Sequence, residues 1–308
     1  MKKVYVILNP NAKKFRLHIS ELDRYTGIQY DGLRIFMSGD INELTDNIKQ
    51  ILADNPDYIC IGGGDGTIHI VLTELVNAYK PHSIPPILIL KEGTMDNVAR
   101  TINLEGHGAE ILKRLISSIK KEKEIRIFRR DTIDINGKYC FLFGLGFITN
   151  FLKLVYSGGE KGTLRNTYVG AKTLVEALLN ITEGEVFKNM DFNIEADGRK
   201  IGANPVTGLL SGTVEHIGMG FSPLIEASVV PGKFQTIILG MEPRHVLFNI
   251  SKIRHGDKIS EPGYANFHSS LMTLTHNGQF EYTMDGDLYT ADRELVIKSG
   301  PAIDLVKV

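Results

Sequence analysis

The chain has 308 residues, of which 43% are hydrophobic, and a formal net charge of −1. This length and composition support substantial apolar cores and indicate two domains. The near-neutral charge argues against a nucleic acid as the main partner, because nucleic-acid binders usually carry a clear basic excess. No apolar run in the sequence approaches the length of a membrane span, so we expect any membrane contact to be peripheral.

The N-terminal segment reads as a first strand. Residues 4–8 are apolar but too few for a secretion signal, and Asn9-Pro10 marks a turn directly after them. The two cysteines, Cys60 and Cys140, lie far apart in apolar stretches, which favours buried free thiols in a reducing compartment. Together these features predict a cytoplasmic protein.

Strand-like and helix-like patterns alternate in the first part of the chain. Residues 58–61 form an apolar run typical of a buried strand. Helical spacing is found before and after this run, in the apolar residues Leu44, Ile48, Ile51 and Leu52 and then in Ile68, Val71, Leu72, Leu75, Val76 and Tyr79. This alternation predicts a parallel α/β sheet.

A glycine-rich loop, Gly62-Gly63-Gly64-Asp65-Gly66-Thr67, connects that strand to the following helix. Glycines let the backbone approach a ligand closely, and the helix offers free amides and a positive dipole end to a phosphate. Asp65 would repel a bare phosphate, so we expect it to act through a cation, a proton or a hydroxyl. The loop therefore predicts phosphoryl transfer. The structural alternative is a tight turn in which Asp65 caps the helix.

A second strand, loop and helix follow. Residues 87–90 read as a buried strand, Lys91-Glu92-Gly93-Thr94 as a loop with Thr94 as the helix N-cap, and Met95, Val98, Ala99 and Ile102 as the apolar face of the helix. Loops at the carboxyl ends of parallel strands line one crevice, where such sheets bind ligands. We therefore expect the two loops to lie side by side.

The pattern changes near Glu124. Short apolar stretches separated by Gly, Asn, Asp and Pro predict antiparallel strands, interrupted by one helix with an apolar stripe from Leu164 to Leu178. A basic cluster at the change could face anionic lipid, although Glu122 and Glu124 within it favour an ordinary solvated edge. The cluster consists of Lys120, Lys121, Lys123, Arg126, Arg129 and Arg130.

Several motifs, taken in order, resemble the diacylglycerol kinase catalytic-domain family, in its soluble bacterial branch related to sphingosine and ceramide kinases. They are Asn9-Pro10, the glycine loop, Gly93-Thr94 ahead of Ala99-Arg100, and a late Asp285-Gly286-Asp287. The loop alone is less specific, because NAD kinases and phosphofructokinases carry similar loops. The resemblance implies an ATP-binding α/β domain with a parallel sheet at residues 1–126, for which 293–308 are a candidate completing segment. Residues 127–292 would then form an antiparallel β-sandwich that holds the acceptor.

The resemblance also implies the chemistry. ATP would be the donor, Mg²⁺ the cofactor and a lipid alcohol such as diacylglycerol the acceptor, reached by transient contact with the inner membrane face; a homodimer is left open. The implied catalytic residues are Asp65 and Asp287, and the implied metal ligands are Asp65, Asp96 and Asp285. The implied nucleotide-binding residues are Asn9, Pro10, Asn11, Ser38, Gly62, Gly63, Gly64, Asp65, Gly66, Thr67, Gly93 and Thr94.

The sequence departs from the family pattern at four places. Asn11-Ala12 replaces Ser-Gly, Asp96-Asn97 exchanges the usual Asn-Asp, Val230-Pro231-Gly232 replaces an Asp-Asp-Gly that supports a structural metal, and Asp287 replaces Glu. Asp96 also suits a helix first turn, and Asp285-Gly286 also suits a hairpin. The sequence predicts an ATP-dependent lipid kinase. The alternatives are an NAD kinase-like enzyme and a nucleotide- or lipid-binding regulatory protein that has lost catalysis.

Overall fold

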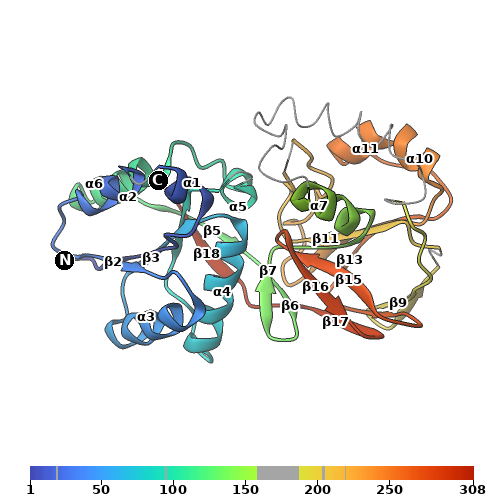
Figure 1. The fold of residues 1–308 in the computed structure, drawn as a ribbon, viewed down its shortest axis with the longest axis horizontal. Coiled ribbons are helices and arrows are strands. Elements are labelled where there is room, and N and C mark those ends of the chain that lie inside the picture. The colour runs from blue at the N-terminus through green and yellow to red at the C-terminus, as the bar shows by residue number, and fades with distance from the viewer. Residues whose placement is uncertain (19, 94–95, 158–186, 203–204, 219) are drawn as a thin grey trace. The chain divides into compact units, whose positions relative to one another are not determined.

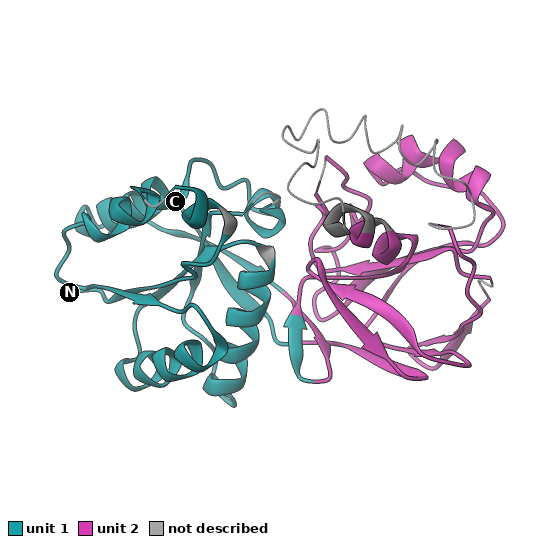
Figure 2. Ribbon diagram, viewed as in Figure 1, with its two compact units in different colours: residues 1–130, 137–139, 301–308 teal, residues 131–136, 140–300 magenta. Residues whose placement is uncertain are grey.

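The computed structural model describes residues 1–18, 20–93, 96–157, 187–202, 205–218 and 220–308 (Figure 1). The chain divides into two compact units (Figure 2). Unit 1 comprises residues 1–130, 137–139 and 301–308, and unit 2 comprises residues 131–136 and 140–300. The helix predicted between Leu164 and Leu178 lies outside the described residues.

Unit 1 is built on a six-stranded sheet in the order β2-β1-β3-β4-β18-β5. Strands β2, β1, β3, β4 and β18 pair in parallel, and β5 pairs antiparallel with β18. The strands are β1 (Val4–Leu8), β2 (Leu33–Met37), β3 (Tyr58–Gly63), β4 (Ile87–Lys91), β5 (Arg126–Arg130) and β18 (Ile303–Lys307). The helices are α1 (Lys13–Leu17), α2 (Ser20–Thr26), α3 (Ile41–Asp54), α4 (Asp65–Tyr79), α5 (Asn97–Thr101) and α6 (Gly108–Lys120).

The packing of unit 1 follows from the apolar pattern of its elements. Strands β1, β3 and β4 are almost fully buried, as expected for inner strands of a parallel sheet that is covered on both faces. In α4 the predicted apolar stripe, from Ile68 to Tyr79, is buried as one helix face. Helix α3 begins at a side-chain cap, because the carboxylate of Asp40 accepts hydrogen bonds from the backbone N–H groups of Asn42 and Glu43.

Unit 2 is a sandwich of two antiparallel sheets, in the orders β10-β9-β14-β17-β6-β7 and β13-β12-β11-β8-β15-β16. Their inner faces share one apolar core, which includes Ile194, Leu274 and Ile297 from the first sheet and Phe143, Phe234, Ile238 and Met284 from the second. The strands of the first sheet are β6 (Ile133–Ile135), β7 (Lys138–Cys140), β9 (Asn193–Ala196), β10 (Arg199–Ile201), β14 (Leu271–Thr275) and β17 (Glu294–Ser299). Of β7, only Cys140 is assigned to unit 2. Those of the second are β8 (Leu142–Gly146), β11 (Gly208–Gly212), β12 (Phe234–Leu239), β13 (Tyr264–Ser269), β15 (Phe280–Met284) and β16 (Asp287–Ala291).

The described part of unit 2 contains the helices α7 (Phe147–Ser157), α10 (Pro243–Phe248) and α11 (Ile250–His255). Within the described ranges, no helix is long and apolar enough to cross a bilayer. Together, an α/β unit with a parallel sheet and a unit of antiparallel sheets confirm the predicted fold class.

The two units divide at positions that differ slightly from the sequence pattern. The first domain was expected to end at residue 126, whereas unit 1 continues through β5 to Arg130. Of the candidate completing segment 293–308, β17 belongs to unit 2, and β18 lies between β4 and β5 in the sheet of unit 1.

Two-residue hairpin turns recur in this structure. Asn136-Gly137, Asp197-Gly198 and Asp285-Gly286 each join two consecutive strands, and in all three pairs both residues have positive φ. This geometry defines the type I′ turn, in which Asn-Gly and Asp-Gly are favoured. Asp285-Gly286 is therefore a hairpin turn, and Asp287 is the first residue of the strand that follows it.

Candidate functional site

The glycine loop forms the junction between β3 and α4 in unit 1. Strand β3 ends at Gly63 and α4 begins at Asp65, so Gly64 is the N-cap residue. Its backbone is extended, with φ −80° and ψ 177°, and no side chain caps the helix. The first N–H groups of α4 lack partners in the helix itself, which is the arrangement that binds anions. The side chain of Asp65 lies outside the description.

The three consecutive glycines serve different purposes. A Cβ atom on Gly62 would lie 2.4 Å from a methyl carbon of Leu8, and one on Gly63 would lie 2.5 Å from Cβ of Thr67. A Cβ atom on Gly64 would meet no atom of the described residues within 4 Å. Internal packing therefore explains Gly62 and Gly63, whereas Gly64 keeps a space open in front of the helix terminus.

Asn9 ties the first strand to this loop. Its side-chain amide donates a hydrogen bond to the hydroxyl of Thr67 at 3.0 Å, and its side-chain oxygen accepts one from the N–H of Asn11 at 2.9 Å. The Asn11 side chain in turn donates to the carbonyl oxygen of Gly39 at 2.8 Å. Pro10 lies half-buried between the two asparagines. The first-strand motif thus positions the first turn of α4.

Ser38 belongs to the neighbouring segment after β2. Its hydroxyl oxygen accepts a hydrogen bond from the side chain of Asn47 at 3.0 Å, and its backbone N–H donates to Leu8 at 2.9 Å. Ser38 is buried and lies next to Gly39, which Asn11 contacts. Ser38 is therefore linked to the glycine loop indirectly, through Gly39 and the hydrogen bonds of Asn11 and Asn9.

A pocket of about 480 Å³ opens over the glycine loop. It joins residues that follow three neighbouring strands: Gly64, Gly66 and Thr67 after β3, Glu92 and Gly93 after β4, and Ala12, Lys14, Leu17 and His18 after β1. The two loops that we expected side by side both line it. Thr94, the predicted N-cap, lies outside the described residues.

The sequence did not point to a buried charge cluster in this pocket. The carboxylate of Glu92, whose side chain is 1% exposed, lies 2.5 Å from the ammonium group of Lys14, which is 29% exposed. The hydroxyl of Tyr25 donates to the other carboxylate oxygen of Glu92. A Cβ atom on Gly108 would lie 1.9 Å from that oxygen, so only glycine leaves it room. Burial, followed by the Glu92 charge, raises the pKa of Tyr25, which keeps this phenol protonated as a donor.

In this cluster the cation, Lys14, lines the pocket, and the anion that pairs with it, Glu92, is buried. Lys14 faces the pocket beside Gly64 and Thr67, whereas the Glu92 carboxylate is enclosed by Lys14 and Tyr25. A signal for it was present in the sequence: an acid at position 92 is unexpected between a buried strand and a phosphate-type loop.

Asp96 holds the second loop in shape. It is the N-cap residue of α5, in the left-handed conformation with φ 49° and ψ 42°, and its carboxylate accepts a hydrogen bond from the N–H of Gly93 at 3.0 Å. It lies in unit 1, as the glycine loop does.

The late motif lies in unit 2. The Asp285 carboxylate accepts hydrogen bonds from the N–H groups of Phe141 at 3.1 Å and Leu142 at 2.8 Å. Asp287 is half-buried at the start of β16, opposite Met284. Burial, followed by the Asp287 charge, raises the pKa of Tyr289 to about 12. Asp285 thus has a structural role in this turn, whereas Asp287 is partly accessible to solvent.

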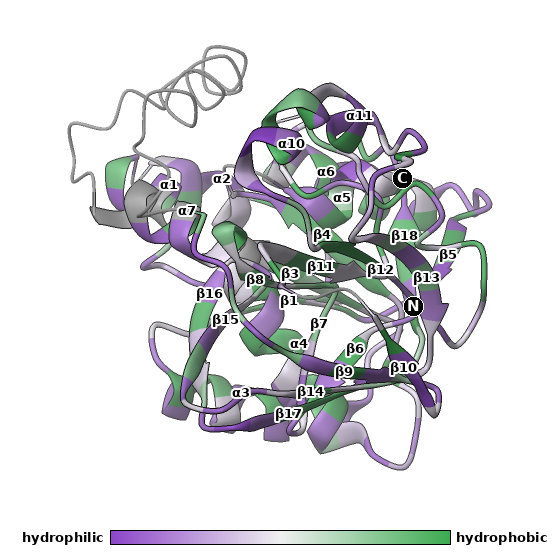
Figure 3. Ribbon diagram, turned by 90° about the vertical axis from the view of Figure 1, so that its right-hand side faces the viewer, coloured by the Kyte–Doolittle hydropathy of each residue, from purple (hydrophilic) through white to green (hydrophobic). Residues whose placement is uncertain are grey.

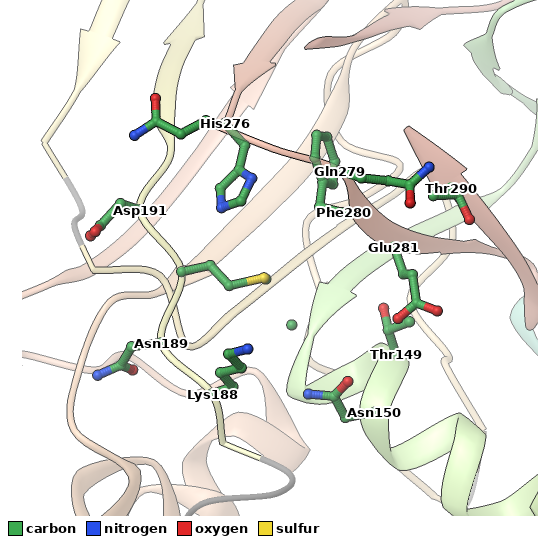
Figure 4. Close-up of a pocket in the computed structure, with 13 residues that line it drawn as sticks. Thr149, Asn150, Lys188, Asn189, Asp191, His276, Gln279, Phe280, Glu281 and Thr290 are labelled. Atoms are coloured by element: carbon green, nitrogen blue, oxygen red, sulfur yellow. The ribbon is translucent and has the colours of Figure 1, made fainter. Parts of the chain in front are cut away.

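A second pocket, of about 570 Å³, lies in unit 2 (Figure 4). Most of its described lining residues are polar, and none of them is a predicted catalytic, nucleotide-binding or metal-binding residue. Side chains that surround it in Figure 4 include Thr149, Asn150, Lys188, Gln279, Glu281 and Thr290.

Comparison with known protein families gives a match within unit 1. Residues 3–127 match the family model described as the diacylglycerol kinase catalytic domain, which confirms the resemblance of the motifs. Comparison with curated proteins gives no match.

Three of the solved structures that resemble the chain come from Bacillus anthracis strain Sterne. Two, described as a candidate diacylglycerol kinase, have TM-scores of 0.73 and 0.72 and are each 18% identical to this chain. A third, described as a diacylglycerol kinase, has a TM-score of 0.66 and 17% identity. Each match covers 100% of this chain and 97% of the other. At this identity the likeness shows a shared fold across both units.

Proposed function

Since residues 3–127 match the family model of the diacylglycerol kinase catalytic domain, we propose that the protein transfers the terminal phosphoryl group of ATP to the hydroxyl of diacylglycerol or a similar lipid alcohol. The observation that carries this proposal is the space in front of Gly64. It combines a helix terminus whose N-cap residue has no side chain, the Thr67 hydroxyl and the Lys14 cation in one pocket, and no packing against the described residues requires a glycine there.

In this proposal the pocket holds the phosphates of ATP. The amides of Gly63 to Thr67 and the ammonium group of Lys14 face charge that builds up on the transferred group, and fixed donors of this kind stabilise a phosphoryl-transfer transition state. Asn9 and Asn11 act by positioning the first turn of α4. Ser38, Pro10, Gly93 and Thr94 remain predicted nucleotide contacts.

Asp287 is the proposed general base. It would accept the proton of the lipid hydroxyl as the hydroxyl oxygen forms a bond to the terminal phosphorus of ATP. The bond between that phosphorus and the bridging oxygen breaks, and ADP leaves. Aspartate is one methylene shorter than the Glu that the family usually has, and a base must reach its oxygen before its pKa matters. The hydrogen bonds that the Asp285 carboxylate accepts fix the turn before β16, and they thereby position Asp287, the first residue of that strand.

Kinases generally use ATP with a divalent metal, which neutralises phosphate charge. Among the described residues, no three His, Cys, Asp or Glu side chains converge to hold an ion. The carboxylates of Asp96 and Asp285 already accept backbone hydrogen bonds. We therefore assign no step to a metal, and Asp65, Asp96 and Asp285 remain predicted ligands of Mg²⁺.

The lipid acceptor implies a site of action. An alcohol with two acyl chains is held in a membrane, so the protein would act from the cytoplasm by transient contact with the inner membrane face. Turnover should then rise with the mole fraction of acceptor in mixed micelles.

The decisive experiment is a transfer assay with radiolabelled ATP against diacylglycerol, a sphingoid base, an undecaprenol-type alcohol and NAD. We expect a labelled lipid phosphate from diacylglycerol. Label in NAD would instead identify an NAD kinase-like enzyme. ATP binding without transfer to any of the four acceptors would identify a regulatory protein.

A further inference from the structure

Helices α10 and α11 form an almost continuous helical segment with one solvent-exposed face. Asn249 joins them: its N–H donates to the carbonyl oxygen of His245 at 3.1 Å, and its own carbonyl oxygen accepts from the N–H of Ile253 at 2.8 Å. The exposed residues Arg244, Phe248, Lys252 and His255 recur at intervals of three or four, which places them on one side. Val246, Asn249 and Ile253 are buried on the other side.

Phe248 is the distinctive residue of this face. It is 84% exposed, whereas the other described phenylalanine side chains are half-buried or buried. Ile225, which is 51% exposed, lies beside the end of α11, because a Cβ atom on Gly256 would come within 2.6 Å of its side chain. A single exposed apolar side chain is ordinary on a protein surface, so Phe248 is informative only together with its neighbours.

Those neighbours are mainly cationic. Residues 242–258 contain four Lys or Arg and two acidic residues, although the whole chain has a net charge of −1. Arg244 is paired with Glu242 at 2.8 Å, and Arg254 donates to the carbonyl oxygen of Gly220 at 3.1 Å. Lys252 and Lys258 are exposed and form no ion pair with any described residue. Figure 3 shows both hydrophilic and hydrophobic residues along the two helices.

We propose that this Phe248 face, formed by Arg244, Phe248, Lys252, His255, Lys258 and Ile225, docks on an anionic lipid surface. An exposed aromatic ring next to exposed cations suits the boundary between headgroups and acyl chains, where the ring leaves water and the cations meet lipid phosphates. The proposal rests on the proposed function, since the membrane would carry the acceptor, and it assigns the contact to unit 2.

The basic cluster of residues 120–130 is the competing surface, and it lies in unit 1. It contains six Lys or Arg and two Glu, so attraction by charge alone would favour it. Its most exposed apolar residue, Ile127, is 44% exposed on strand β5. Binding through the Phe248 face would depend on a protruding apolar side chain, whereas binding through the basic cluster would depend on net charge.

Vesicle co-sedimentation of the full chain tests the proposal, with phosphatidylcholine vesicles that contain or lack phosphatidylglycerol. We expect binding that requires phosphatidylglycerol, a loss of about tenfold in affinity for Phe248→Ser, and a larger loss for Lys252→Glu with Lys258→Glu. The matched controls, Ile127→Ser and Lys120→Glu with Lys121→Glu, should bind as wild type does. Phe248 is so exposed that Phe248→Ser should melt at the wild-type temperature.

Three results would overturn the proposal. The first is that wild type does not bind anionic vesicles, and the second is that the unit 1 variants lose binding while Phe248→Ser keeps it. The third is a dimer that Phe248→Ser converts to a monomer, without any vesicle binding.

Turnover of a dispersed short-chain diacylglycerol separates this proposal from the proposed function. That turnover should be equal in wild type and Phe248→Ser. If wild type binds vesicles through Phe248 but lacks that turnover, the kinase function fails and the docking surface stands.

Discussion

Asp285 and Leu142 exchange two hydrogen bonds: the N–H of Asp285 donates to the carbonyl oxygen of Leu142 at 3.0 Å, and the Asp285 carboxylate accepts from the N–H of Leu142 at 2.8 Å. The same carboxylate accepts from Phe141. These bonds hold the turn between β15 and β16 against the start of β8. Since Asp287 follows the turn directly, its position depends on them.

Asp285→Ala should therefore destabilise unit 2. The change leaves two backbone N–H groups without their carboxylate partner and places alanine at φ 48°, where only Gly, Asn and Asp are common. We expect a loss of about 2–3 kcal/mol in the free energy of unfolding, measured with urea. Asp285→Asn, which tolerates this φ and keeps one oxygen acceptor, should lose less. Equal stability of Asp285→Ala and wild type would contradict the structural role.

Asp287→Asn tests the general base. The amide cannot take the proton of the acceptor hydroxyl, so turnover should fall by about two to four orders of magnitude while ATP affinity stays the same. Asp287→Glu should keep or raise turnover if the longer side chain fits. The measurements are kcat in the transfer assay and ATP affinity by calorimetry. If Asp287→Asn turns over like wild type, the late motif has no catalytic role.

Gly64→Val tests the phosphate loop. The backbone of Gly64 has negative φ and a Cβ atom there meets none of the described atoms, so the variant should fold normally. In the nucleotide complex the same side chain would occupy the space of the phosphates, and we expect ATP binding to disappear in calorimetry. Gly278→Val, at an equally open glycine of unit 2, is the matched control and should bind ATP normally. Unchanged affinity in folded Gly64→Val would remove the loop from the nucleotide site.

Lys14→Met separates the two effects of the buried ion pair. The change leaves the Glu92 carboxylate buried without a cation, which should cost about 3–5 kcal/mol in the free energy of unfolding. It also removes a cation from the pocket. Adding Glu92→Gln should restore most of the stability but not the ATP affinity. If the double variant binds ATP as wild type does, Lys14 serves stability alone.

Asp197 should make unit 2 sensitive to acid. Burial alone would raise its pKa, but hydrogen bonds from Lys233, Ser270 and Leu271 outweigh burial and lower the pKa to about 2. A lowered pKa in the folded state stabilises the fold above the unfolded value near 4, and this contribution disappears as the pH falls from about 4 to 2. Because Asp197 is largely exposed, we expect less than about 1 kcal/mol.

Urea unfolding of wild type and Asp197→Asn between pH 2 and 7 measures this contribution. Asparagine tolerates the φ of 46° at this position, so the comparison isolates the charge. The two proteins should differ near pH 7 and converge near pH 2. A difference that is independent of pH would show that the charge of Asp197 contributes nothing.

The local sequence was sufficient to predict the glycine loop between β3 and α4, and the α/β and antiparallel patterns of the two units. These features depend on side-chain periodicity and glycine conformation over stretches of a few residues, which the sequence shows directly. The Asp-Gly pair at 285–286 likewise indicated a hairpin, because few residues adopt positive φ.

Only the tertiary structure shows which residues that are distant in the sequence contact one another. Lys14, Tyr25 and Glu92 come from three segments of unit 1, and nothing in their spacing indicates that one carboxylate is buried between the other two side chains. The hydrogen bonds from Phe141 and Leu142 to Asp285 join residues more than 140 positions apart. Such contacts depend on how strands and helices pack after they form. A buried charge is stable only where the assembled fold supplies its partner, and the local sequence does not specify that partner.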